Sequence, residues 1–189
     1  VLPAKDLVAF PSVMMSFYVG RQASINAIEA SMAQENLILV VSQKDQTIEN
    51  PEANDLYKTG VVANIIRTLK IDDDRYKLLI QGLMRVKVRK FAEKGECLYA
   101  DVEAVLPQES TESSAEGVDM VNRIRTNLEA MVDYQNLPDD MLMVIEEVED
   151  PGMLADLILA HLKPDVGLAQ SALEEFDPIK RLKIVESLL

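Results

Sequence analysis

A change of pattern near residue 107 constrains the fold of this 189-residue chain more than any other feature. Before it, short β-branched runs are separated by turn residues; after it, apolar residues recur at helical spacing. Between the two lies Pro107–Gly117, rich in Ser, Thr and Glu with almost nothing apolar, as is typical of a linker or long loop. We therefore predict a β-rich subdomain over 1–109, a linker over 110–117 and an α-helical subdomain over 118–189.

Several apolar or alternating runs in the first part predict strands, because β-branched residues and period-two alternation suit a pleated, half-buried surface. Acidic and Gly-containing turns separate two of the pairs and predict hairpins. A single helical pattern, Ser24–Met32, interrupts the strands. Together these elements predict a small twisted barrel or sheet roll. The strand runs are Val13–Val19, Leu37–Val41, Gly60–Leu69, Tyr76–Ile80, 84–90 and Cys97–Leu106.

Two Asp-Pro pairs predict helix starts in the second part. Asp can cap free backbone N–H groups, and Pro suits the first helical position. Asp150-Pro151 precedes apolar residues on one helical face, and Asp177-Pro178 repeats the signal. Further helical spacing covers Val118–Met131, Met141–Val148 and Leu168–Glu175. The predicted fold class is α+β, a β-barrel or twisted-sheet subdomain followed by helices.

The charge of the chain is uneven and limits its partners. Residues 1–109 hold 13 Lys and Arg against 15 Asp and Glu, whereas residues 110–189 hold 6 against 17. The net charge of −13 makes nucleic acid an unfavourable partner, because phosphate neutralisation needs a clustered positive field. No segment reaches about 18 uninterrupted apolar residues, so we expect no membrane span. Hydrophobic residues make up 48% of the chain, as expected of an ordinary soluble globular protein.

The sequence contains few candidate catalytic or metal-binding residues. The chain has one Cys and one His, which excludes an intramolecular disulfide and Cys-rich or two-His metal sites. The sequence indicates no catalytic partner for His161 or Cys97, so a structural role is favoured for both. The acidic runs 72–74 and 146–150 lack the ligand spacing of a calcium loop and are interpreted as solvated. The sequence holds no phosphate loop and no nucleophile elbow. We predict no catalytic residue, no cofactor and no metal.

A basic strand leaves a second interpretation open. Arg85, Lys87 and Arg89 alternate with apolar residues. Together with Lys90 they form a basic face that could contact an acidic partner or nucleic acid. The overall charge favours a solvated strand face instead.

The segment 10–18 is the strongest candidate for a binding surface. Neighbouring residues of a strand point to opposite faces, so Met14 and Met15 cannot both enter one core. Flexible Met and aromatic side chains suit a surface that accepts many partners. The alternative is that both faces of this strand are covered. The candidate substrate-binding residues are Phe10, Pro11, Met14, Met15, Phe17 and Tyr18.

Five segments, taken in this order and spacing, resemble the amino-terminal domain of bacterial Lon proteases. They are Gly20-Arg-x-x-Ser-Ile-x-Ala-Ile28, Asn54-Asp-Leu-Tyr-x-x-Gly-Val-Val-Ala63, Leu79-Ile-Gln-Gly-Leu-x-Arg85, Asp150-Pro-x-x-Leu-Ala-Asp-x-Ile158 and Leu173-Glu-Glu-x-Asp-x-x-x-Arg-Leu182. The resemblance implies a PUA-like β-rich domain followed by a helical subdomain. It also implies a non-catalytic function, the recognition of unfolded, damaged or degron-bearing proteins for an ATP-dependent protease.

The same resemblance implies partners outside this chain. These partners are the ATPase and Ser–Lys protease modules of the longer protein and the other subunits of a homo-hexamer. The resemblance also implies a cytoplasmic location. The chain begins at Val1 rather than Met and ends within a predicted helix, so we expect a piece excised from a longer protease. A stand-alone Lon-domain binding protein is one alternative, and a PUA-like nucleic-acid-binding module is another.

Overall fold

The computed structural model describes residues 1–72, 75–106, 115–135 and 144–189. Backbone contacts divide the chain into two compact units. The first, here called the β unit, comprises Val1–Leu106 together with Asp165–Leu173. The second, the helical unit, comprises Pro107–Pro164 and Glu174–Leu189.

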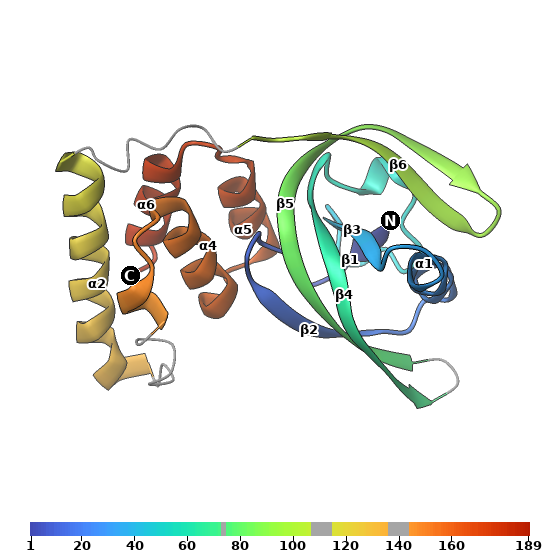
Figure 1. Ribbon diagram of the computed structural model, residues 1–189, viewed down its shortest axis with the longest axis horizontal. Helices are drawn as coiled ribbons and strands as arrows, with labels where there is room; N and C mark the ends of the chain where they lie inside the picture. The colour runs from blue at the N-terminus through green and yellow to red at the C-terminus, as the bar shows by residue number, and fades with distance from the viewer. Residues whose placement is uncertain (73–74, 107–114, 136–143) are drawn as a thin grey trace. The chain divides into compact units, whose positions relative to one another are not determined.

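Six strands of the β unit form one curled sheet (Figure 1). The main path runs β1-β3-β4-β5-β2, and β6 pairs with the far half of β5. β1 is parallel to β3, and the other pairs are antiparallel. The bounds are β1 Leu2–Ala4, β2 Met14–Val19, β3 Leu37–Ser42, β4 Thr59–Asp72, β5 Arg75–Lys94 and β6 Cys97–Ala104. The strands predicted from the sequence are present, and β1 is an additional one.

β5 is one continuous strand, where the sequence predicts two strands separated near Gly82. Gly82 pairs instead of breaking the strand: its N–H donates to Val13 O at 3.0 Å, and its carbonyl accepts from Ser12 N–H at 2.9 Å. A Cβ at position 82 would lie 2.1 Å from Phe10 O, so glycine allows the preceding loop to approach β5. Ser12 has φ +61° and forms a bulge with Val13 opposite this glycine.

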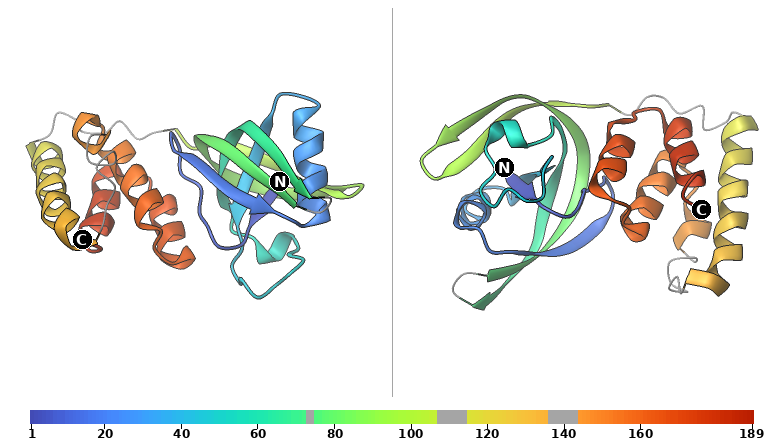
Figure 2. Two further views of the ribbon diagram at one scale, coloured as in Figure 1. Left: turned by 90° about the horizontal axis from the view of Figure 1, so that it is seen from below. Right: turned by 180° about the vertical axis from the view of Figure 1, so that it is seen from behind.

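One helix and a short 3₁₀ turn complete this part of the unit. α1 (Gln22–Met32) packs against β1, β3 and β6 on the concave side of the sheet and buries Ile25 and Ile28 (Figures 1 and 2). The helix predicted over Ser24–Met32 is confirmed, although Met32, at the end of the predicted face, is exposed. The turn η1 (Ala53–Asp55) is held by a capping box with Glu52.

The helical unit contains α2 (Ala115–Gln135), α4 (Pro151–Leu162), α6 (Pro178–Glu186) and a helical turn at 144–147. Both predicted Asp-Pro starts are confirmed. The Asp150 carboxylate accepts from Met153 N–H, and that of Asp177 accepts from Ile179 N–H at 2.9 Å. The predicted beginning of a helix at residues 141–143 lies outside the described residues.

α5 (Val166–Glu174) clusters with the sheet, although the boundary drawn from the sequence assigns it to the helical subdomain. Two contacts explain this. The Gln170 amide nitrogen donates to Thr59 O at 3.1 Å, and the Arg85 guanidinium donates to Leu173 O at 3.2 Å. A Gln that is 1% exposed and bonded to a strand backbone fixes the helix on the β unit, and no sequence pattern signals such a contact.

Candidate functional site

β2 lies at an edge of the curled sheet, and its exposure alternates along the strand. Met14, Ser16 and Tyr18 are exposed, whereas Met15 and Phe17 are half-buried. β2 pairs in regular register with β5, so alternate side chains point to opposite faces. The two neighbouring methionines are therefore on different faces, as the sequence predicts.

The outer face of β2 continues across β5 to β4. Tyr18 and Leu69 both lie opposite Lys77, one on each side of β5, and share its face. Met14 is 60% exposed, Tyr18 67% and Leu69 53%. A bulge between Ile65 and Arg67 leaves the side chain of Ile66 exposed as well. We call Met14, Tyr18, Ile66 and Leu69 the outer patch.

Lys77 lies between Tyr18 and Leu69 on the face of the outer patch. Its ammonium lies 5.9 Å from the centroid of the Tyr18 ring, within the range of a cation–π contact. This contact orients an otherwise exposed tyrosine. Leu79, two residues further on and facing the same side, is half-buried. This face therefore presents apolar side chains together with two basic ones, Lys77 and Arg67, the latter opposite Leu79.

The end of β2 borders a pocket of about 370 Å³ between this strand and β1. Phe17 and Tyr18 line it from β2, and Leu2 and Leu7 line it from β1 and the loop that follows. The sheet is open here, because β1 and β2 stand at the two ends of the main strand path and do not pair with each other.

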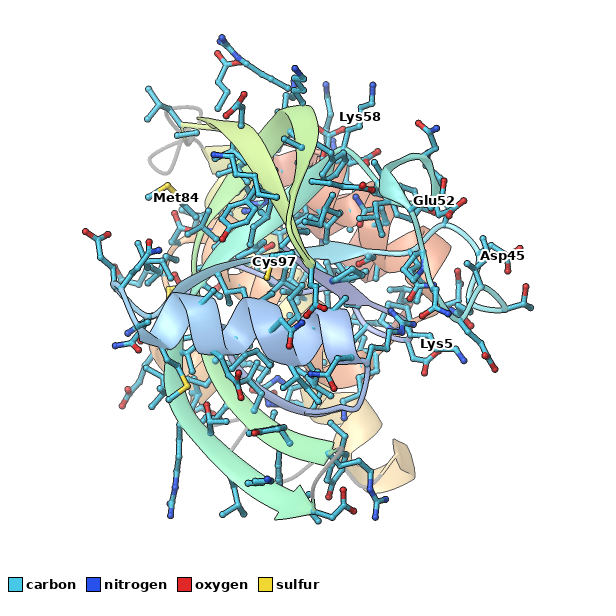
Figure 3. The ribbon with its side chains drawn as sticks, turned by 90° about the vertical axis from the view of Figure 1, so that its right-hand side faces the viewer. Lys5, Asp45, Glu52, Lys58, Met84 and Cys97 are labelled. Carbon is cyan, nitrogen blue, oxygen red and sulfur yellow. The ribbon has the colours of Figure 1, made fainter. Side chains whose placement is uncertain are left out.

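The rim of this pocket is charged. Lys5, Asp6 and Arg21 line it, and Figure 3 shows Lys5 at the surface. Arg21 donates to the Gln43 side chain. Burial lowers the pKa of the Arg21 guanidinium from its usual value, and Asp6 opposes that shift. Because an arginine side chain stays protonated in proteins, the rim carries charges of both signs.

The six residues that the sequence singles out are separated by the structure. Met14 and Tyr18 belong to the outer patch, and Phe17 lines the pocket. Met15 and Pro11 are half-buried. Phe10 is 1% exposed and lies in the core, so it offers no surface to a partner. Phe10 precedes the bulge at Ser12, in the loop whose backbone lies against Gly82 of β5.

Sequence reasoning did not include Ile66 or Leu69. They belong to a run interpreted as a buried strand. Only the register of β4 against β5 places Leu69 on the same face as Tyr18, with Lys77 between them. An exposed hydrophobic residue has no local signal when its strand is apolar on both faces.

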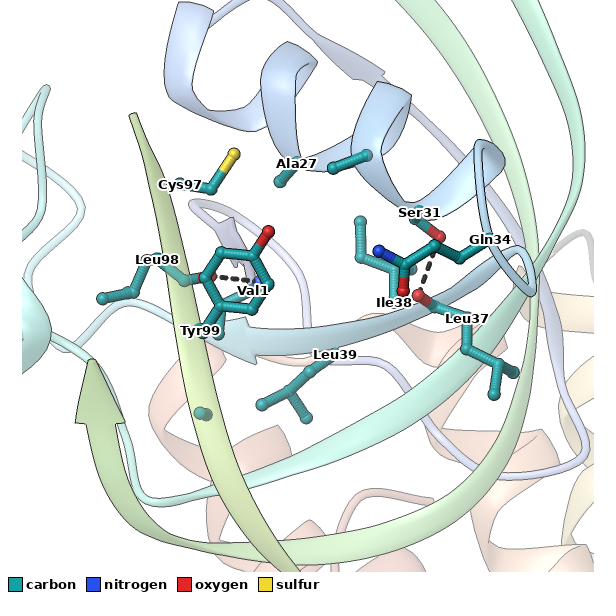
Figure 4. A pocket seen from close by; sticks show the side chains of 12 residues that line it. Val1, Ala27, Ser31, Gln34, Leu37, Ile38, Leu39, Cys97, Leu98 and Tyr99 are labelled. Carbon is teal, nitrogen blue, oxygen red and sulfur yellow. Dashed lines mark hydrogen bonds between the residues drawn. The ribbon is translucent and has the colours of Figure 1, made fainter. Parts of the chain in front are cut away.

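A second pocket, of about 250 Å³, lies between α1, β3 and β6 (Figure 4). Cys97 and Tyr99 line it from β6, and Ala27 and Ser31 line it from α1. Cys97 is half-buried. His161 belongs to α4 of the helical unit, where its Nδ1 lies 2.8 Å from Leu157 O. Within the described residues no group of three or more His, Cys, Asp or Glu could hold a metal ion.

The basic strand is partly engaged within the protein. The Arg85 guanidinium bonds to Leu173 O, and Arg89 forms an ion pair with Glu103 at 3.0 Å. In the helical unit, Arg125 likewise donates to the carbonyls of Glu146 and Val148. These contacts give the arginines structural partners. The contacts of Arg85 and Arg89 leave the basic strand with a weaker positive face than the sequence alone suggests.

None of the helices in the described part of the chain is both long and apolar enough to cross a bilayer.

An apolar surface patch beside an open sheet edge, on a mixed α+β scaffold, is typical of a domain with an interaction surface. The family model described as the ATP-dependent protease La (LON) substrate-binding domain matches residues 1–189. The chain belongs to this family. The match confirms the resemblance drawn from the five sequence segments.

Relatives and solved structures agree with this family. The Lon protease of Aquifex aeolicus is 37% identical over all of this chain, and that of Escherichia coli (strain K12) is 31% identical. The chain spans 24% of the length of each. The N-terminal domain of a Mycobacterium avium complex Lon protease superposes with a TM-score of 0.79 at 20% identity, covering 97% of this chain and 92% of that one. A Lon N-terminal domain protein from Xanthomonas campestris gives 0.68 at 14% identity, covering 98% and 95%.

Proposed function

We propose that this domain binds unfolded or damaged protein chains through the outer patch of the β unit and performs no catalysis itself. The observation that carries the proposal is the exposure of Met14, Tyr18 and Leu69 on one sheet face, with the exposed Ile66 in the adjoining bulge of β4. Unfolded chains expose apolar segments, and a patch of this kind binds them by removing both surfaces from water.

The size of the patch suits weak and reversible binding. Fully burying one large apolar side chain is worth about 1.5–3 kcal/mol, and much of that gain offsets the lost freedom of association. A flexible methionine adapts to different partners. Several such residues favour many-partner binding with release. That is what a domain needs if it passes a substrate on.

Three of the other candidate residues keep a place in the proposal. Phe17 and Met15 line or flank the inner side of β2, where a bound chain can reach them at the open edge. Pro11 stands half-buried before the strand. Phe10 supports the surface from the core and is not part of it.

A double substitution tests the patch. Met14→Ser with Tyr18→Ser should weaken binding of a permanently unfolded probe, reduced and carboxymethylated α-lactalbumin, about tenfold or more, because two apolar contacts are lost. Fluorescence anisotropy of the labelled probe measures the affinity. Because both residues are mainly exposed, the stability of the domain should change by only about 0.5 kcal/mol.

The matched control is Met32→Ser with Tyr99→Ser, which removes the same two residue types from elsewhere on the β unit. Met32 is 49% exposed and Tyr99 41%. This control should bind the probe as the unchanged chain does. Equal losses from both pairs would show nonspecific hydrophobic binding, and no loss from the first pair would reject the outer patch.

The proposal extends to the longer protein in which such a domain works. We propose that it delivers bound chains to ATPase and protease modules outside residues 1–189. We further propose that it supports assembly of a homo-hexamer and that it operates in the cytoplasm. The support for this extension is family membership together with the 24% share of the Lon relatives that the chain spans.

A further inference from the structure

Three strands of the β unit have an edge that faces no other strand among the described residues: β1, β2 and β6. Proteins usually protect such edges with proline, charge, shortness or a bulge, because an open edge pairs with any extended chain. β1 has three residues, one of them Pro3, which has no N–H. β6 carries Asp101 and Glu103, and the latter is paired with Arg89.

β2 lacks those protections. Its six residues, Met14–Val19, include no charge and no proline. The bulge at Ser12 and Val13 lies before the strand and leaves its register with β5 regular from Met14 to Val19. An edge that is apolar, regular and uncharged is the kind that accepts another strand.

The hydrogen-bond pattern shows which groups this edge offers. Val13 pairs with Gly82 through the Gly82 N–H, so Met15 and Phe17 also turn their N–H and C=O groups toward β5. By the same alternation Met14, Ser16 and Tyr18 turn theirs away from β5. Such an array of donors and acceptors matches the main chain of an extended segment.

The surroundings of the edge fit an added strand on both of its faces. On one side lies the outer patch, with Met14 and Tyr18. On the other side lie the half-buried Met15 and Phe17, and Phe17 lines the 370 Å³ pocket that Tyr18 also borders at the end of the strand. Side chains of a strand alternate between faces, so a peptide paired with β2 would place every second side chain on the patch and the others toward the pocket.

We propose that substrates bind as an extended segment that adds a strand to the free edge of β2, pairing with the main chain of Met14, Ser16 and Tyr18. This inference rests on the proposed function and defines its substrate class: an unfolded segment of about five or six residues that can become extended. Main-chain pairing recognises the absence of folded structure instead of a sequence. It therefore explains how one small patch can accept many proteins.

Amide hydrogen exchange of the 189-residue chain tests the pairing directly. With saturating reduced, carboxymethylated α-lactalbumin, the amides of Ser16 and Tyr18 should exchange at least tenfold more slowly than in the free chain. The amides of Met15 and Phe17 already bond to β5 and should change much less. Equal rates for Ser16 and Tyr18 with and without the probe would overturn the proposal.

A proline substitution gives an independent test. Ser16→Pro removes an outward N–H without removing a bond to β5, a position where strands tolerate proline. It should weaken probe binding about three- to tenfold, the worth of a lost hydrogen bond, whereas Ser16→Ala should bind normally. Thermal melts of both variants check folding, and the exchange measurement decides the matter if Ser16→Pro unfolds.

The two proposals fail differently. If Met14→Ser with Tyr18→Ser weakens binding but Ser16→Pro behaves as Ser16→Ala and the amides stay unprotected, the patch binds through side chains only and strand addition is rejected. If the unchanged chain does not bind the unfolded probe at all, the proposed function itself is rejected.

Discussion

At the residue scale, Asp156 and Arg181 place two opposite charges in the interior of the helical unit. The Arg181 Nε lies 3.0 Å from Asp156 Oδ1, and the two side chains are 5% and 4% exposed. Arg181 also donates to Glu175 O, so it joins α4, α6 and the segment between α5 and α6. Removing one partner of such a pair leaves a buried charge uncompensated, whereas replacing both removes the desolvation cost as well.

Asp156→Ala should therefore lower the free energy of unfolding by about 3–5 kcal/mol. Urea unfolding followed by circular dichroism measures this, and urea does not screen the charges. The double variant Asp156→Leu with Arg181→Met should recover most of the loss. A double variant as unstable as Asp156→Ala would show that the bond of Arg181 to Glu175 O, and not the ion pair, stabilises this core.

At the scale of elements, two helices begin in the same way. Asp150 and Asp177 each occupy the N-cap, each precedes Pro, and each carboxylate accepts a backbone N–H of the first turn. These bonds satisfy donors that the helix cannot, and the acidic charge faces the positive end of the helix dipole.

Asp150→Ala and Asp177→Ala should each lower stability by about 1 kcal/mol, because a capping acceptor is lost. Asparagine caps as well as aspartate, so Asp150→Asn and Asp177→Asn serve as controls and should cost little. The midpoints of urea unfolding curves compare the stabilities of the four variants. Equal losses for Ala and Asn would assign the effect to charge instead of the cap.

Local signals made these elements predictable. The Asp-Pro starts, the alternation in Cys97–Leu106 and the helical spacing of Ile25 and Ile28 each act over a few residues. The continuity of β5 through Gly82 and the position of Phe10 were not predictable in this way, because both depend on a loop meeting a strand about seventy residues away. The association of α5 with the sheet has the same origin, a side chain that bonds to a distant backbone.

The candidate site was predictable in part. Alternation in a strand separates Met14 from Met15, and the structure agrees. The sequence could not show that Tyr18 and Leu69 share one face, because that depends on strand order and register. It also could not show that β2 is an edge strand.

At the scale of the whole molecule, the acidic excess belongs to residues 110–189, whereas the candidate surface lies in the nearly neutral residues 1–109. Binding through the outer patch should therefore depend on apolar contact and main-chain pairing more than on net charge. The methionines allow this to be observed across the chain, because nine are spread over it.

Methionine methyl NMR of the chain with reduced, carboxymethylated α-lactalbumin is the most direct test of the central claim, that substrates bind at β2 of the β unit. Met14 is 60% exposed in the outer patch, and Met153 of α4 is 40% exposed in the helical unit. The Met14 methyl signal should shift or broaden on titration while that of Met153 stays unchanged. A shift of Met153 with an unaffected Met14 would place the substrate on the helical unit and contradict this account.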